Sequence, residues 1–248
     1  MSARIVTAAV IIIGNEILSG RTQDTNLRDI ALTLGRCGIN IIEARVVPDI
    51  EERIVAAVNE LRLRHDYVLT TGGIGPTHDD ITAACIAKAF GVELVEHPVI
   101  AAMIRSREAA PNVMAARLRM ALVPRGAGLI ENDAGSPPGF FIGNVHVLAG
   151  IPHVMRAMLA ALERKLVGGA VTQSRSVVAY IGESAIAEPL GNLQAQQRSV
   201  DIGSYPFVRD GRIGTSLVVR GTDPVLLDEV VAHIEQMLLA AGVQPTRE

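Results

Sequence analysis

The clearest chemical feature of the chain is a run of glycines followed by carboxylates, TTGGIGPTHDDIT, at residues 70–82. It lies between a predicted strand and a predicted helix, a junction that forms the ligand-binding edge of an open parallel sheet. Glycines let several backbone N–H groups approach a ligand, and the helix start adds partial positive charge. The run therefore predicts a phosphate or pyrophosphate site, although it matches neither the P-loop nor the GxGxxG dinucleotide fingerprint. The plainer alternative is a turn with Asp79 or Asp80 as helix N-cap.

The adjacent carboxylates Asp79 and Asp80 would repel a bare phosphate. A divalent cation would remove this conflict, because hard cations such as Mg²⁺ bind carboxylate and phosphate oxygens together. His78 would widen the choice to softer metals, but a solvated loop residue is the better interpretation. A divalent ion (Mg²⁺, Mn²⁺ or Co²⁺) is therefore a candidate cofactor.

Further polar loops follow other predicted strands at the same edge. Glu16, Asp24 and Asn26 follow the first strand, and Asp49 follows the second. Each has an ordinary alternative, a polar loop or a helix N-cap. Because several such loops share the carboxyl edge, a ligand cleft is the better interpretation. Two backbone-rich turns are predicted to join them: residues 135–139 and 149–152.

Strand and helix patterns alternate in the first part of the chain, which predicts right-handed βαβ units and a parallel sheet. The continuous β-branched-rich run at 5–13 predicts a strand covered on both faces, and apolar residues three and four apart predict the helices. The predicted strands are 5–13, 39–47, 67–71 and 145–149; the predicted helices are 25–37, 51–64, 81–90, 97–122 with a break at Pro111, and 154–166.

The regular alternation of strand and helix patterns ends at Gly168 and Gly169. A strand, a helix, two strands and a closing helix are predicted over residues 176–238, with an Asp-Gly hairpin turn at 210–211. The sequence thus predicts a three-layer α/β/α domain with a mostly parallel sheet over 1–168, followed by a small α+β (βαββα) subdomain over 169–248.

Composition narrows the function classes. The net charge is −3 and aromatic residues make up 3% of 248 residues, so we expect no nucleic-acid partner. Mean hydropathy is +0.32, but no stretch of 18 apolar residues occurs, so we expect no membrane partner. The amino terminus lacks a signal-peptide pattern and the chain has 2 Cys, which favours the cytoplasm.

Four motifs together resemble a known family. IGNEILSG at 13–20, VPD at 47–49, TGGIGPTHDDIT at 71–82 and GSPPG at 135–139 resemble the molybdopterin-binding (MoaB/Mog-type) domain. The likeness covers about residues 4–166 and extends to the amino-terminal half of competence/damage-inducible protein A (CinA) and to eukaryotic FAD synthases. GES at 182–184 and SYP at 204–206 resemble the small subdomain that follows in the CinA branch.

The resemblance implies a cleft for a phosphorylated pterin, such as molybdopterin, or a nucleotide, in a protein that forms homo-oligomers. Carboxylates matching Asp49 and Asp80 take part in molybdopterin adenylylation in relatives, so these two are the candidate catalytic residues. Asp79, Asp80 and Glu16 are the candidate metal ligands. The candidate ligand-binding residues are Gly14, Glu16, Thr71, Gly72, Gly73, Gly75, Thr77, Asp79, Thr82, Gly135, Ser136 and Gly139.

Three functions stay open at this point. The first is ligand binding of the molybdopterin-binding type. The second, implied by the CinA branch, is metal-dependent hydrolysis of ADP-ribose-like or FAD-like pyrophosphates, with Asp49 as base or orienting group. The third is a noncatalytic interaction protein on the same fold. Because these 248 residues contain no match to the further deamidase domain of CinA, we expect no nicotinamide mononucleotide deamidation.

Two departures from the family pattern bear on the site. Asn15 stands where many relatives have Asp, which removes one candidate metal-binding carboxylate. The turn AGIPH at 149–153 replaces a more usual Leu-Pro-Gly-Val-Pro, so the contacts of this turn are expected to differ.

Overall fold

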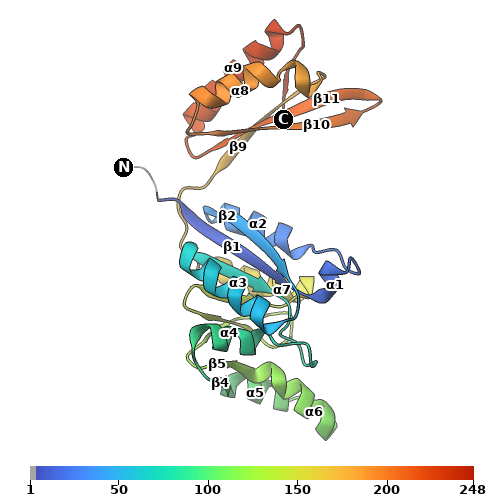
Figure 1. The fold of residues 1–248 in the computed structure, drawn as a ribbon, viewed down its shortest axis with the longest axis vertical. Coiled ribbons are helices and arrows are strands. Elements are labelled where there is room, and N and C mark those ends of the chain that lie inside the picture. Colours follow the sequence, from blue (N-terminus) through green and yellow to red (C-terminus); the bar gives the residue numbers. More distant parts are fainter. Residues whose placement is uncertain (1–3) are drawn as a thin grey trace. The chain divides into compact units, whose positions relative to one another are not determined.

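A computed structural model describes residues 4–248 (Figure 1). The chain folds as two units, the first ending at Gly169 and the second beginning at Ala170. Within the described chain, no helix combines the length and apolar character that a membrane crossing requires.

The first unit is built on a six-stranded sheet in the order β2-β1-β3-β8-β7-β6. The first four of these strands are parallel, whereas β7 and β6 run antiparallel to their neighbours. The predicted α/β fold with a mostly parallel sheet is thus confirmed. The strands of this sheet are β1 (Val6–Ile13), β2 (Ile39–Val47), β3 (Tyr67–Thr71), β6 (Gly128–Ile130), β7 (Gly139–Ile142) and β8 (Val145–Leu148).

Helices cover both faces of this sheet, as Figure 1 shows. The packing of alternate residues explains why β1 is apolar at every position except Thr7: Ile11 packs on the side of α3, α4 and α5, and Val10 on the side of α2 and α7. The helices are α1 (Asn15–Leu18), α2 (Asn26–Arg36), α3 (Glu51–Arg64), α4 (Thr82–Phe90), α5 (Pro98–Arg105), α6 (Pro111–Leu118) and α7 (Pro152–Glu163).

The long helix predicted over 97–122 is two helices, α5 and α6, followed by the short 3-10 helix η1 (Arg119–Ala121). Proline begins each of the two, because its fixed φ suits the first turn and its ring cannot continue a preceding helix. A short antiparallel pair, β4 (Leu94–Glu96) and β5 (Leu122–Pro124), joins the two ends of the segment 98–121, the α5–α6 excursion. Residues 98–121 thereby leave the sheet and return to it.

The second unit has a four-stranded antiparallel sheet in the order β10-β11-β9-β12. The hairpin between β10 and β11 turns at Asp210 and Gly211, both with positive φ, as the Asp-Gly pair predicts. The short strand β12 was not predicted. The elements are β9 (Gln173–Ala179), the 3-10 helix η2 (Glu183–Ala185), α8 (Ala187–Gln196), β10 (Asp201–Arg209), β11 (Arg212–Gly221), α9 (Pro224–Ala240) and β12 (Thr246–Arg247).

His146 is a histidine whose burial shifts its titration. It lies on β8, is 7% exposed, and stacks against Phe141 of β7 with ring centroids 5.5 Å apart. Burial lowers the pKa of His146 to about 4, because the low-dielectric core disfavours the charged ring. The folded protein therefore holds this histidine neutral at pH values where an exposed one would take up a proton.

We expect His146 to make the first unit less stable in acid. Its folded pKa of about 4 lies below the ordinary 6.5, so the unfolded chain binds the proton first. Stability is complete above pH 6.5 and falls as the pH drops toward 4, by up to about 3 kcal/mol. Denaturant unfolding of the native chain and of His146→Phe across this range measures the effect. Equal acid losses in the two proteins would refute it.

Candidate functional site

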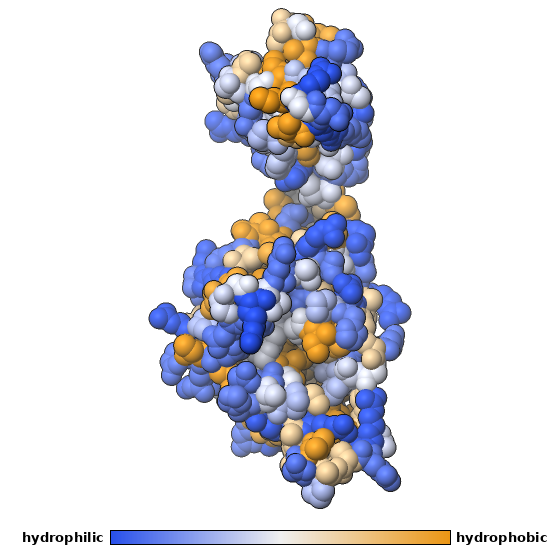
Figure 2. Space-filling view, turned by 90° about the vertical axis from the view of Figure 1, so that its right-hand side faces the viewer, coloured by the Kyte–Doolittle hydropathy of each residue, from blue (hydrophilic) through white to orange (hydrophobic). Residues whose placement is uncertain are grey.

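A cleft of about 610 Å³ opens at the carboxyl ends of β1, β3 and β8. Figure 2 faces this edge of the first unit and shows a hollow with apolar atoms between polar ones. The lining comes from five segments of the chain: Glu16 and Thr22; residues 72–76, Asp80 and Ala83; Arg107, Arg119, Met120 and Leu122; residues 136–138 and Phe140; and residues 149–152, Val154 and Met158.

The glycine loop after β3 is held very close to its neighbours. Gly72 and Gly73 have φ values of 100° and 66°, and a Cβ on Gly72 would lie 2.1 Å from the carbonyl oxygen of Ile13. The N–H of Gly72 donates to Leu148 O at 3.3 Å, which ties the loop to β8. No side chain larger than hydrogen fits at Gly72, so this part of the loop presents only backbone to the cleft.

Thr82, the first residue of α4, fixes the loop from the other side. Its hydroxyl donates to Gly72 O at 2.9 Å and its N–H donates to Gly73 O at 3.0 Å. Because Thr82 is fully buried, these bonds set the direction of both glycine carbonyls. Within residues 4–248, the N–H groups of residues 73–75 have no hydrogen-bond partner. The loop therefore directs its carbonyls inward and keeps three backbone donors available.

Asp80 supports the turn that follows the glycines. Its Oδ2 accepts hydrogen bonds from the N–H of Thr77 at 2.8 Å and from the Thr77 hydroxyl. A Cβ on Gly75 would lie 2.6 Å from the same carboxylate, so Gly75 is required for Asp80 to fit beneath the loop. The Thr77 hydroxyl also lies near Asp79 and is the main reason that the pKa of Asp79 is lowered. One hydroxyl proton serves one carboxylate at a time, and the hydrogen-bond geometry assigns it to Asp80.

Two arginines line the cleft on the side of the α5–α6 excursion. Nη2 of Arg107 donates to the carbonyl of Gly135 at 2.7 Å, which joins the excursion to the 135–139 turn. Arg119 has no hydrogen bond or ion pair with any residue of the described chain. Sequence reasoning missed both, because nothing in their local pattern separates them from the many solvent-exposed arginines of this chain.

The structure brings together six of the residues predicted for the site. Asp80 and five of the predicted ligand-binding residues line the cleft. The others lie beside it, and several of them have supporting contacts. The six lining residues are Glu16, Gly72, Gly73, Gly75, Asp80 and Ser136, and the residues that do not line it are Gly14, Asp49, Thr71, Thr77, Asp79, Thr82, Gly135 and Gly139.

The predicted catalytic pair is not assembled in the cleft. Oδ2 of Asp49 accepts a hydrogen bond from the N–H of Asn15 at 2.9 Å, so this carboxylate caps the short helix α1. The N–H of Gly14 donates to Val47 O at 3.1 Å and ties the same loop to β2. Asp49 thus positions the segment that carries Glu16, while Asp80 alone of the pair faces the cleft.

The three predicted metal ligands are likewise not gathered. Among residues 4–248, no group of three or more His, Cys, Asp or Glu side chains is placed to hold a metal ion. Asp79 lies outside the cleft lining, and Asp80 is directed at Thr77. The described residues thus offer no preassembled site for a metal ion, and the roles of Asp79, Asp80 and Glu16 as metal ligands stay a prediction.

Asn26 connects two loops at the polar end of the cleft. It is 4% exposed, and its Nδ2 donates to the carbonyl of Gly150 at 2.8 Å, which fixes the turn between β8 and α7. A small pocket of about 70 Å³ beside Asn26 shares Glu16 and Thr22 with the main cleft. The loops after β1 and β8 are thereby held in one arrangement around the glycine loop.

Comparisons with known proteins agree with this architecture. Residues 9–168 match the family described as "probable molybdopterin binding domain", and residues 172–247 match "FAD synthase, middle domain". A protein of Archaeoglobus fulgidus is 32% identical over 230 residues, which cover 92% of this chain and 96% of that protein. A CinA-like protein of Gemmatimonas aurantiaca is 35% identical over 212 residues.

The CinA-like protein is longer: the match covers 79% of this chain and 50% of that protein, so the chain spans about half its length. Among solved structures, the protein CinA with unknown function from Thermoplasma acidophilum is 36% identical, with a TM-score of 0.59 over 64% of this chain and 96% of that one. These findings confirm the family resemblance and the fold class inferred from the sequence.

Gly72→Ala is expected to destabilise the first unit by about 3 kcal/mol or more, because the new Cβ overlaps the Ile13 carbonyl. Gly20→Ala is the matched control: Gly20 also has a positive φ (71°), but nothing lies within 4 Å of its Cβ position. It should cost only about 1 kcal/mol, the conformational term. Denaturant unfolding of both variants measures the difference, and similar losses would show that the close approach is unimportant.

Proposed function

The chain belongs to the molybdopterin-binding domain family, and we propose that its cleft binds a phosphorylated pterin or a nucleotide on the glycine loop 72–75. The observation that carries this proposal is the set of free N–H groups of residues 73–75, at a loop that lines the cleft and leads to α4. Successive free N–H groups near a helix N-terminus attract phosphate oxygens. Three of the four residues of this loop are glycines, which lets the phosphate approach the N–H groups closely.

The arginines support an anionic ligand. Arg107 and Arg119 face the cleft from the excursion, and the guanidinium of Arg119 makes no hydrogen bond or ion pair within the described chain, although its charge helps to lower the pKa of Asp79. A guanidinium offers several donors in a planar fork that matches phosphate oxygens. The carboxylate of Asp80 already accepts two hydrogen bonds from Thr77, which lowers its repulsion of a nearby phosphate. The cleft therefore combines backbone and cationic donors for one anionic group.

The remainder of the cleft suits a flat ring system. Met120 and Leu122 on one side, and Pro137, Pro138 and Phe140 on another, give it apolar walls. Its volume of about 610 Å³ lies in the range of sites that enclose drug-sized molecules. A pterin or a purine with its phosphate would use both parts, the rings between the apolar side chains and the phosphate on the backbone and arginines.

A second candidate function is hydrolysis of a dinucleotide pyrophosphate. It is favoured by Asp80, a carboxylate that lines the same cleft as two arginines. This function would need a divalent ion supplied together with the substrate phosphates. A noncatalytic interaction protein is the third alternative. Homo-oligomer formation and a cytoplasmic location stay predictions.

We expect Arg107→Gln and Arg119→Gln each to weaken binding of ADP-ribose by about 10- to 100-fold, since each removes a charge-assisted bond to phosphate. Arg105→Gln is the matched control, because Arg105 pairs with Glu96 and does not line the cleft. Isothermal titration calorimetry of the native chain and the three variants measures the affinities. Equal losses in Arg105→Gln, or none in the other two, would contradict the proposed phosphate site.

The hydrolase candidate predicts AMP release from ADP-ribose, FAD or NAD in the presence of Mg²⁺, Mn²⁺ or Co²⁺. Asp80→Ala should abolish this release, whereas Asp79→Ala should retain most of it because Asp79 lies outside the cleft lining. Chromatography of the reaction products measures AMP. Absence of AMP with every metal would exclude the hydrolase and leave the binding proposal to the calorimetry. If none of these nucleotides nor molybdopterin binds, the interaction protein is favoured.

A further inference from the structure

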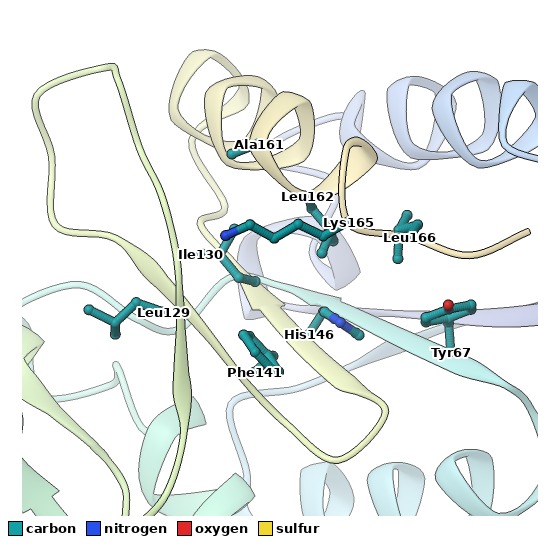
Figure 3. Close-up of a pocket in the computed structure, with 9 residues that line it drawn as sticks. All are labelled: Tyr67, Leu129, Ile130, Phe141, His146, Ala161, Leu162, Lys165 and Leu166. Carbon is teal, nitrogen blue, oxygen red and sulfur yellow. The ribbon is translucent and has the colours of Figure 1, made fainter.

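A second pocket of about 150 Å³ lies at the opposite end of the sheet from the cleft (Figure 3). Its floor is formed near the beginnings of β3 and β8, by Tyr67 and His146, together with Phe141 of β7. The last turn of α7 and the residues after it, including Leu162 and Leu166, cover it. It shares no residue with the lining of the cleft, so the proposed function does not account for it.

Three rings stand side by side on the floor of this pocket. Phe141 and His146 are directly opposite each other across the β7–β8 pair and stack with an interplanar angle of 17°. Tyr67 flanks His146 on the other side, with ring centroids 5.7 Å apart. Figure 3 shows the row under α7. In a chain with only 3 Tyr and 4 Phe, this row is an unusual concentration of flat apolar surface.

His146 adds one directed polar atom to the pocket. Its Nδ1 lies 3.3 Å from the carbonyl of Asn144, which fixes the proton on Nδ1 and leaves a lone pair on Nε2. No residue of the described chain donates a hydrogen bond to Nε2, and this atom is not among the side-chain polar atoms shut off from solvent, so it is reached through the pocket. Burial also keeps the ring neutral at pH 7, since it lowers the pKa of His146 to about 4. The pocket thus contains a neutral acceptor that lacks a donor.

Packing alone does not explain a histidine at position 146, because an apolar ring would pack there equally well. Nε2 is open to the pocket and needs a donor there, whereas a phenylalanine at this position would stack on Phe141 and need none. The imidazole is accounted for if a molecule that enters the pocket supplies the donor. Lys165, at the roof, pairs with Glu131 at 3.2 Å, so its charge is already balanced and calls for no anion.

We propose that this pocket binds a small, neutral, planar molecule of one ring that donates an N–H or O–H to Nε2 of His146. The volume sets the size, because an apolar protein cavity of about 150 Å³ holds benzene. The row of rings sets the flatness, and Nε2 sets the need for a donor. Phenols and single-ring nitrogen heterocycles with an N–H are the chemical class that satisfies all three conditions.

Phenol and toluene test this proposal on the full chain, because they share the ring and differ in the donor. In a nuclear magnetic resonance titration with ¹⁵N-labelled histidine, phenol should shift the Nε2 signal of His146 and toluene should not. His146→Phe should weaken phenol binding about tenfold, the loss of one hydrogen bond, and leave toluene binding unchanged or stronger. Leu166→Trp, at the roof, should block both molecules.

Three results would overturn the proposal. The first is an Nε2 signal that does not move at about 20 mM phenol, well above the ~1 mM Kd expected for so small a ligand. The second is equal phenol affinity in the native chain and in His146→Phe. The third is binding of phenol that Leu166→Trp leaves intact. The spectrum of each variant reports whether it is folded, so a loss through unfolding is recognised separately.

Discussion

The close approach of Gly72 to the carbonyl of Ile13 is the constraint on which the cleft depends. Two parallel strands, β1 and β3, end side by side, and the chain leaving β3 must turn across the end of β1. Only glycine fits where a Cβ would lie 2.1 Å from a carbonyl oxygen. Thr82 then fixes the glycine carbonyls from α4, and the N–H groups of residues 73–75 have no hydrogen-bond partner among residues 4–248. The glycine loop therefore accounts both for the packing at the end of β1 and for the available backbone N–H donors.

The second half of the cleft has a different origin. The excursion 98–121 leaves the sheet through the β4–β5 pair and brings two arginines to face the glycine loop. One of them, Arg107, is bound to the carbonyl of Gly135 and so links the excursion to the 135–139 turn. Backbone donors are therefore supplied by the rigid sheet edge and charged donors by a peripheral segment. Such a division lets a site combine fixed geometry with adjustable charge.

Much of the fold could be predicted from the sequence. The run that forms β1 is almost wholly apolar, strand and helix patterns alternate through β2 and β3, and the stripes of α2, α3 and α7 are periodic, so the class of the fold followed from them. Strands β6 and β7 were missed because three or four residues between glycines and prolines carry no periodicity. Pro111 was recognised as a break, but not as the start of a second helix.

The site was predictable only where its residues belong to a local motif. Gly72, Gly73, Gly75 and Asp80 lie in one run, and the structure places all of them on the cleft. Arg107 and Arg119 lie in no motif, since tertiary packing alone brings them there. Asp49 is the opposite case: it lies at the predicted edge of the sheet but caps α1 and does not line the cleft, so its catalytic role stays a prediction.

The central claim is that the free N–H groups of the glycine loop hold a phosphate. Amide ¹H–¹⁵N spectra of the full chain, titrated with ADP-ribose and separately with ribose, test it most directly. The account predicts that ADP-ribose moves the amide signals of residues 73–75 downfield, with changes at Arg107 and Arg119, and that ribose does not. Saturable binding of ADP-ribose that leaves the signals of residues 73–75 in place would contradict it.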